Sequence, residues 1–151
     1  MCDFDVRRSY LGQDIGAIMK IGFVQYEVTR DGRENFDIVQ KHIASMDCEI
    51  AILPELGDCG YLFEDRKELN SFSKPIEENA FVDNLKRLSA QKGCTIVAGV
   101  AERDGGKIYN SSVVIENGII RGVYRKIHLS DFEKKLFDSG DANTVFEVNG
   151  I

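Results

Sequence analysis

The stretch that decides the fold reads Ile52-Leu53-Pro54-Glu55-Leu56-Gly57-Asp58-Cys59-Gly60-Tyr61. Residues 49–53, which lead into it, form a short apolar run of the kind that makes a buried strand. Pro54 has no backbone N–H to give to a strand ladder, so the chain is expected to leave the sheet there. The sequence therefore places the Glu55 carboxylate at the C-terminal edge of a strand, where functional sites cluster in α/β sheets.

A second charged side chain is predicted at the tip of another strand. The segment Tyr124-Arg125-Lys126-Ile127-His128-Leu129 closes a predicted strand over residues 119–126, so Lys126 ends it. Acyl transfer from an amide needs a general base and a fixed cation that stabilises the oxyanion. Glu55 and Lys126 are of the right types, and we expect partial burial to raise the pKa of Glu55 toward the range of a useful base. Taken singly, a solvated loop glutamate and a solvated strand-end lysine are the commoner roles.

The rest of the sequence alternates strand and helix signals. Asp31 can cap a helix whose apolar residues recur at three- and four-residue spacing up to about Asp47. A second helix ends at Gly93, which stands in the position of a terminating glycine. Two Gly-containing turns, at residues 104–106 and 117–118, indicate hairpins and an antiparallel meander. The pattern predicts an α/β fold in which a mixed sheet carries helices on one face. The predicted strands are 20–26, 49–53, 95–102, 107–116 and 119–126, and the later helices are 64–70 and 77–92.

The composition is that of one ordinary globular domain. The chain has 151 residues, of which 43% are hydrophobic and 29% charged, enough for a sizeable core. Its net charge is −6, and the 19 Lys and Arg residues are spread along the sequence, which argues against nucleic acid or anionic membrane as partners. No apolar stretch approaches the ~18 residues of a membrane span, and no signal peptide is recognisable. We expect a cytoplasmic protein.

The cysteines indicate reduced thiols and no structural metal. Cys2, Cys48, Cys59 and Cys94 form no C-x-x-C pair, and the chain has only two histidines, so no zinc-ligand spacing is present.

The regular strand and helix pattern begins near Met19. Residues 1–19 are therefore predicted to be an N-terminal extension. Two interpretations stay open for it, an upstream addition before an initiating Met19 or a poorly ordered native arm. The domain itself is predicted over residues 20–151.

Several segments, in order, resemble the carbon–nitrogen hydrolase, or nitrilase, superfamily. The resemblance covers nearly everything from Lys20 to Ile151, and it implies the N-terminal part of a nitrilase-like α-β-β-α sandwich. The segments that carry it are Ile21-Gly22-Phe23-Val24-Gln25, Leu53-Pro54-Glu55-Leu56 running to Gly60-Tyr61, Ile96 to Glu102, Tyr109-Asn110-Ser111-Ser112-Val113, Gly122 to Leu129, and Glu133 to Asp141.

The resemblance implies a Glu-Lys-Cys triad and covalent catalysis. By position, Glu55 resembles the general base, Lys126 the residue that stabilises the oxyanion, and Glu133 the second glutamate, which positions the lysine and the substrate. Tyr61 is expected to shape the substrate pocket, with plain core packing as the alternative, and Glu133 is equally compatible with a charged surface turn. The implied reaction passes through a thioester and needs no cofactor. Its substrates would be small amides, carbamoyl compounds or nitriles, and the intact protein would be a homo-oligomer.

One element of the family pattern is missing. The nucleophilic cysteine of the family lies on a strand beyond the stretch matched by residues 144–151, and Cys59 reads as a small buried residue rather than a substitute. We expect a truncated domain that is inactive alone. The alternative is a non-catalytic domain, or a decayed fragment, that binds a partner. A third possibility, a flavodoxin-like module, requires mostly parallel strands, and the two hairpin turns argue against it.

Overall fold

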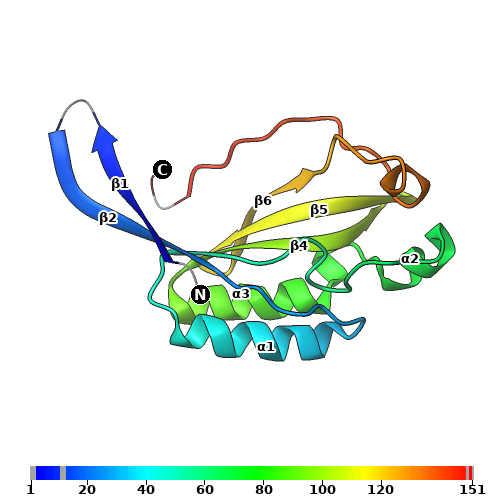
Figure 1. Cartoon of the computed structure of the whole chain (residues 1–151), viewed down its shortest axis with the longest axis horizontal. Coiled ribbons are helices and arrows are strands. Elements are labelled where there is room, and N and C mark those ends of the chain that lie inside the picture. The colour runs from blue at the N-terminus through cyan, green and yellow to red at the C-terminus, as the bar shows by residue number, and fades with distance from the viewer. Residues whose placement is uncertain (1–2, 11–12, 149, 151) are drawn as a thin grey trace.

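The computed structural model describes residues 3–10, 13–148 and 150, and these residues form one six-stranded sheet with helices (Figure 1). The strands lie in the sheet in their sequence order. The pairs β2–β3 and β3–β4 are parallel and the other three neighbouring pairs are antiparallel. The predicted mixed sheet is therefore confirmed. The strands are β1 (Asp3–Tyr10), β2 (Gln13–Phe23), β3 (Ile50–Ile52), β4 (Thr95–Asp104), β5 (Lys107–Glu116) and β6 (Ile119–Arg125).

The two long helices, α1 (Gly32–Ser45) and α3 (Ala80–Lys92), lie side by side on one face of the sheet (Figure 1). Asp31 caps α1 by accepting a hydrogen bond from the backbone N–H of Arg33, as the sequence predicted. Gly93 ends α3 with a φ of 67°, a conformation that glycine adopts without steric cost. The main core lies between this helix pair and the sheet, and it contains Val39, Ile43, Leu85, Ile96, Val113 and Ile115.

Smaller elements differ from the predicted bounds for local reasons. The helix predicted over residues 77–92 is two elements, the 3-10 turn η1 (Ile76–Glu78) and α3, because the side chain of Asn79 accepts backbone hydrogen bonds and starts a new helix. Residues 64–70 contain most of α2 (Arg66–Phe72), which begins after the cap Asp65. A last 3-10 turn, η2, spans Glu133–Lys135.

The segment predicted as an N-terminal extension contributes strand structure. β1 and the first part of β2 pair as an antiparallel hairpin (Figure 1), while residues 1–2 and 11–12 lie outside the described residues. The proposed boundary at residue 19 thus falls inside β2. At the other end of that strand, the ladder continues for one bond past Phe23, from the N–H of Val24 to the carbonyl of Ile52 at 2.9 Å.

The sheet face opposite the helices is crossed by the C-terminal segment (Figure 1). The backbone N–H of Gly140 donates to the carbonyl of Lys126 at 2.9 Å, which fixes the start of this segment beside the end of β6. Further along, the ring of Phe146 lies so close to Gly122 that a Cβ there would approach it to 2.1 Å.

Candidate active site

Glu55 lies in a tight turn directly after β3. The turn is held to β4 by two backbone bonds, from Gly57 N to Gly99 O at 2.8 Å and from Gly99 N to Pro54 O at 3.2 Å. Gly99 permits this approach, because a Cβ at that position would lie 2.5 Å from the Cα of Glu55. Leu56, at a φ of 48°, turns the chain sharply and buries its own side chain. The Glu55 carboxylate is left partly exposed at the edge of the sheet.

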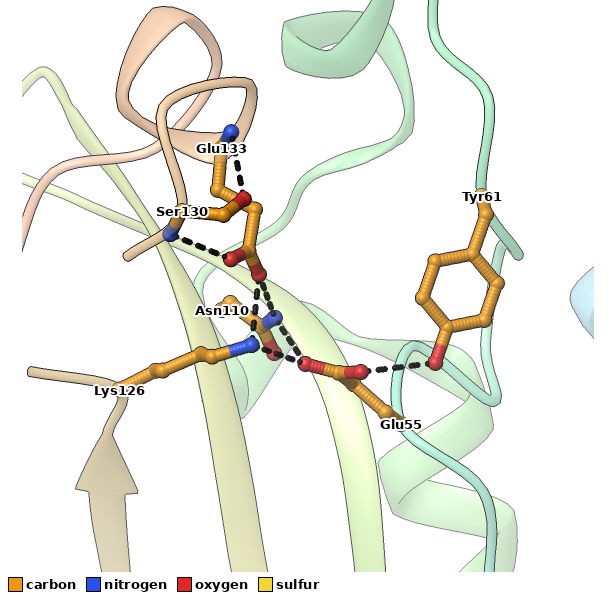
Figure 2. Close-up of polar contacts among 6 residues, drawn as sticks. All are labelled: Glu55, Tyr61, Asn110, Lys126, Ser130 and Glu133. Carbon is orange, nitrogen blue, oxygen red and sulfur yellow. Dashed lines mark hydrogen bonds and ion pairs between the residues drawn. The ribbon is translucent and has the colours of Figure 1, made fainter. Parts of the chain in front are cut away.

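Lys126 follows β6 and points at the same place. Its backbone N–H donates to the carbonyl of Asn110 at 2.8 Å, which keeps the residue against β5. Its side-chain Nζ lies 2.9 Å from Oε1 of Glu55 and 2.7 Å from Oε1 of Glu133 (Figure 2). Two strand ends that are distant in the sequence, together with the turn η2, therefore bring an ammonium and two carboxylates into direct contact.

Glu133 begins η2 and is fixed at both of its carboxylate oxygens. Oε1 faces Lys126, and Oε2 accepts a hydrogen bond from the backbone N–H of Ser130 at 2.9 Å. In return, the backbone N–H of Glu133 donates to Oγ of Ser130 at 3.3 Å (Figure 2). The side chain is 19% exposed, so this glutamate belongs to the cluster and is not a solvated residue of a charged turn.

Tyr61 bonds Glu55 from the side away from Lys126. Its hydroxyl donates to Oε2 of Glu55 at 2.9 Å, so the two oxygens of that carboxylate have different partners (Figure 2). The residue is 48% exposed, which excludes the alternative of plain core packing. All four residues singled out in the sequence thus lie in one connected group.

Asn110 is a member of the group to which the sequence assigned no role. Its Nδ2 donates to Oε1 of Glu55 at 2.6 Å and lies 3.5 Å from Oε1 of Glu133, so that it bridges the two carboxylates (Figure 2). The residue is buried in the middle of β5. A buried amide needs polar partners, so an asparagine within a predicted strand was the signal available in the sequence. Ser130 carried no such signal.

The electrostatics of the cluster differ from the prediction for Glu55. Partial burial raises the pKa of this carboxyl, but hydrogen bonds from three donors outweigh burial and bring the pKa below its ordinary value. The donors are Lys126, Asn110 and Tyr61. The expected rise in the pKa of Glu55 was therefore wrong, because the desolvated site is also rich in donors.

The partners of Glu55 shift in the directions expected for an ion-paired group. Burial acts to raise the pKa of Glu133, but the bonds from Lys126 and Ser130 lower it to about 2. The hydrogen bond to Glu133, together with the contact to Glu55, raises the pKa of Lys126. Both carboxylates and the ammonium are therefore charged near neutral pH, and they leave one net negative charge in the cluster.

The cysteines of the described chain lie elsewhere. Cys59 is buried at the back of the Glu55 turn, and burial together with the neighbouring Asp58 raises the pKa of its thiol far above the ordinary value. Cys94 belongs to the core under the helices, where burial raises its pKa to about 11, and Cys48 packs against that core. Cys2 lies outside the described residues.

Residues 3–10, 13–148 and 150 contain no group of three or more His, Cys, Asp or Glu side chains placed to hold a metal ion. No helix in those ranges has the length and apolar character needed to cross a membrane.

Comparison with known proteins identifies the class. Residues 20–151 match the family described as Carbon-nitrogen hydrolase. A nitrilase of Pyrococcus abyssi is 41% identical over 101 residues, which cover 67% of this chain and 38% of that protein. A citrullinase of Francisella tularensis is 32% identical over 137 residues, covering 83% of this chain and 47% of that protein.

Solved structures give the same fold. The crystal structure of XC1258 from Xanthomonas campestris, a CN-hydrolase superfamily protein, matches with a TM-score of 0.72 at 20% identity, over 84% of this chain and 48% of that one. The chain belongs to the carbon–nitrogen hydrolase family, and its sheet and helices form part of the α-β-β-α fold of that family. It spans about half, or less, of the length of these relatives.

Proposed function

We propose that the cluster around Lys126 is the acid–base half of an active site that hydrolyses a non-peptide C–N bond in a small amide, carbamoyl compound or nitrile. The observation that carries this proposal is the position of Nζ of Lys126, 2.9 Å from Glu55 and 2.7 Å from Glu133. Membership of the carbon–nitrogen hydrolase family supports it.

In the proposed mechanism, Glu55 is the general base. The hydrogen bonds that lower its pKa keep it ionised near neutral pH and therefore able to accept a proton from a cysteine thiol. The thiolate forms a bond to the carbonyl carbon, whose oxygen takes the negative charge. Glu55 then returns its proton to the departing nitrogen, so the C–N bond breaks with release of ammonia or an amine and a thioester remains; a nitrile reaches the same thioester once a water adds to its thioimidate and ammonia leaves. Glu55, again ionised, takes a proton from a second water, which attacks the thioester carbon, and the thiolate leaves and takes the proton back.

Lys126 is proposed to stabilise the oxyanion. An ammonium group has three N–H donors, and here two of them point at carboxylates. The third is available to the substrate oxygen. When Glu55 takes up a proton its attraction for Lys126 weakens, so the lysine can turn further toward the oxyanion while Glu133 keeps it in place.

The thiol in this proposal comes from a cysteine outside the 151 residues, on a strand that would follow them. The burial of Cys59 and the raised pKa of its thiol support this assignment. The relatives called nitrilase and citrullinase support a small-molecule substrate with a nitrile or a carbamoyl-type C–N bond.

The test compares the 151-residue chain with a longer protein that continues into the next strand. We expect no release of ammonia from short aliphatic amides by the chain alone, and turnover by the longer protein that thiol alkylation abolishes. Glu55→Gln and Lys126→Ala in the longer protein should each lower kcat by at least about a hundredfold with the fold retained. Glu64→Gln, an exposed glutamate, is the matched control.

Two results would overturn the proposal. Robust turnover by the 151-residue chain would mean that the nucleophile has been misassigned. A longer protein that binds a protein partner but releases no ammonia from any amide or nitrile would favour the non-catalytic alternative.

A further inference from the structure

A small apolar cavity lies beside the cluster, between the turn that follows Glu55 and the turn that contains η2. Its volume is about 250 Å³. That is slightly below the roughly 300–1,000 Å³ of pockets for drug-sized ligands, so it fits one side group rather than a large molecule. Apart from Glu133 and the phenol of Tyr61, its lining is apolar: Leu56, Leu62, Phe63, Phe132, Leu136 and Phe137.

The floor and the rim of this cavity differ in exposure. Four of the apolar residues are buried and belong to a second core cluster, which also holds Leu69, Ala101 and Ile108, so the floor is rigid. The rim consists of Tyr61, Leu62 and Phe132, which are 48%, 84% and 54% exposed. Three large apolar side chains around one opening form a concentrated exposed patch of the kind that marks a binding site.

Leu62 adds backbone strain to this exposure. Its φ is 66°, a region that costs a non-glycine residue of the order of 1 kcal/mol. The exposed position of this leucine is therefore stabilised neither by burial of its side chain nor by a relaxed backbone conformation. The carbonyl of Leu62 accepts a hydrogen bond from Arg30 Nη2 at 3.0 Å, which holds the residue in this conformation at the rim.

Two residues that line the cavity also belong to the cluster around Lys126. Tyr61 bonds Glu55 and Glu133 bonds Lys126, and both line the cavity. A group seated there therefore lies next to the carboxylates and the ammonium. The net negative charge of the cluster opposes a second anion nearby, since like charges in a partly dry site repel strongly.

We infer that this cavity receives the apolar group of an uncharged substrate, a branched alkyl or phenyl group attached to the amide or nitrile carbon, and that it disfavours substrates bearing a carboxylate. The inference rests on the proposed function for the reacting end of the substrate. The cavity itself is defined by the chain alone.

The first test is binding to the 151-residue chain, followed by backbone amide chemical shifts. Benzamide and isovaleramide should perturb residues 61–63 and 132–137, whereas formamide and succinamate should not. Leu62→Ser and Phe132→Ser should each weaken benzamide binding about three- to tenfold, through loss of apolar contact area. Both residues are exposed, so the fold should tolerate the changes, and Ile119→Ser, which alters an exposed residue of β6, is the matched control.

Equal binding of succinamate and benzamide, or equal weakening by Ile119→Ser and Leu62→Ser, would overturn the inference. Activity separates it from the proposed function. If the longer protein hydrolyses formamide and benzamide equally well and Leu62→Ser leaves kcat/KM unchanged, the cavity assignment fails and the hydrolase proposal stands. If benzamide binds at the cavity but no amide is hydrolysed, the hydrolase proposal fails and the cavity assignment stands.

Discussion

The position of Glu55 depends on the absence of a side chain at Gly99. A methyl group there would meet the backbone of the Glu55 turn at 2.5–2.7 Å, and backbone atoms cannot move aside as a flexible side chain can. Gly99→Ala should therefore displace the turn, lower the free energy of unfolding by about 1–3 kcal/mol and break the contact between Glu55 and Lys126. Urea unfolding measures the first effect, and the side-chain carboxyl shift of Glu55 measures the second.

Ser112→Ala is the control for this change, because Ser112 is the partner of Gly99 in the β4–β5 ladder. It should leave the carboxyl shift of Glu55 unchanged. If Gly99→Ala leaves the pKa of Glu55 at its wild-type value, the close approach does not position the carboxylate.

The low pKa of Glu133 predicts the pH range in which the protein loses stability in acid. A carboxyl whose folded pKa is about 2, against an ordinary value of 4.5, adds stability that is fully present above the ordinary value and is lost as the pH falls through the folded value. Stability should therefore decline between about pH 4.5 and pH 2. In Lys126→Met, which removes the ammonium, the titration of Glu133 by carbon NMR should move up toward 4.5. An unchanged midpoint in that variant would show that Ser130 alone lowers the pKa.

Among the individual residues of the site, the sequence predicted the charged ones better than the residues that hold them in position. Glu55 and Lys126 follow strands in recognisable segments, so their meeting could be predicted from the resemblance. Asn110 lies within one of the segments that carry the resemblance, but its role depends on which face of β5 is turned toward Glu55. Gly99 and Ser130 act through backbone approach and a local turn, which spacing along the sequence does not reveal.

Arg30 stabilises the turn between β3 and α2. Arg30 donates from Nη1 to the carbonyl of Cys59 at 2.9 Å and from Nη2 to that of Leu62 at 3.0 Å. Its guanidinium carbon also lies 3.9 Å from the ring centre of Phe63. These contacts flank Tyr61 on both sides, so Arg30 acts on Glu55 as a positioning residue through that tyrosine.

Arg30→Lys should loosen this turn. A lysine keeps the charge but lacks the planar fork that reaches two carbonyls at once and stacks on a ring. We expect faster amide hydrogen exchange in residues 56–63 and a loss of about 1–2 kcal/mol in the free energy of unfolding. Arg33→Lys, at an exposed arginine in the first turn of α1, should change neither quantity. Equal exchange in the two variants would contradict the positioning role.

Elements with strong local signals were predicted well. The Asp31 cap, the Gly93 terminus and the two hairpin turns are each set by a few adjacent residues, and all are found in the structure. The hairpin of β1 with β2 was not predicted, because charged residues, among them Asp3, Asp5 and Arg7, interrupt the apolar residues of this stretch.

For the whole molecule, the sequence predicted a mixed sheet with helices on one face, and the structure and the family match confirm it. The parallel order of β2, β3 and β4 depends on crossovers through α1 and α3, which the alternation of strand and helix signals along the sequence indicated. The path of the C-terminal segment across the sheet was not predicted, because it has no periodic pattern and is set by contacts such as that of Phe146 with Gly122.

The sheet face away from the helices leads to a prediction for the molecule in solution. Val97 and Tyr124 lie on this face, because their neighbours Ala98 and Val123 point into the helix-side core and side chains alternate along a strand. Both residues are half-buried. The described residues form one layer of helices and one sheet, whereas the family fold packs two sheets together.

We expect the 151-residue chain to self-associate through this face, so its mass by light scattering should rise over a roughly hundredfold increase in concentration. Tyr124→Ser should reduce the association, and Leu62→Ser, which alters an exposed apolar residue away from the sheet, should not. A constant monomer mass would show that the C-terminal segment already covers the face.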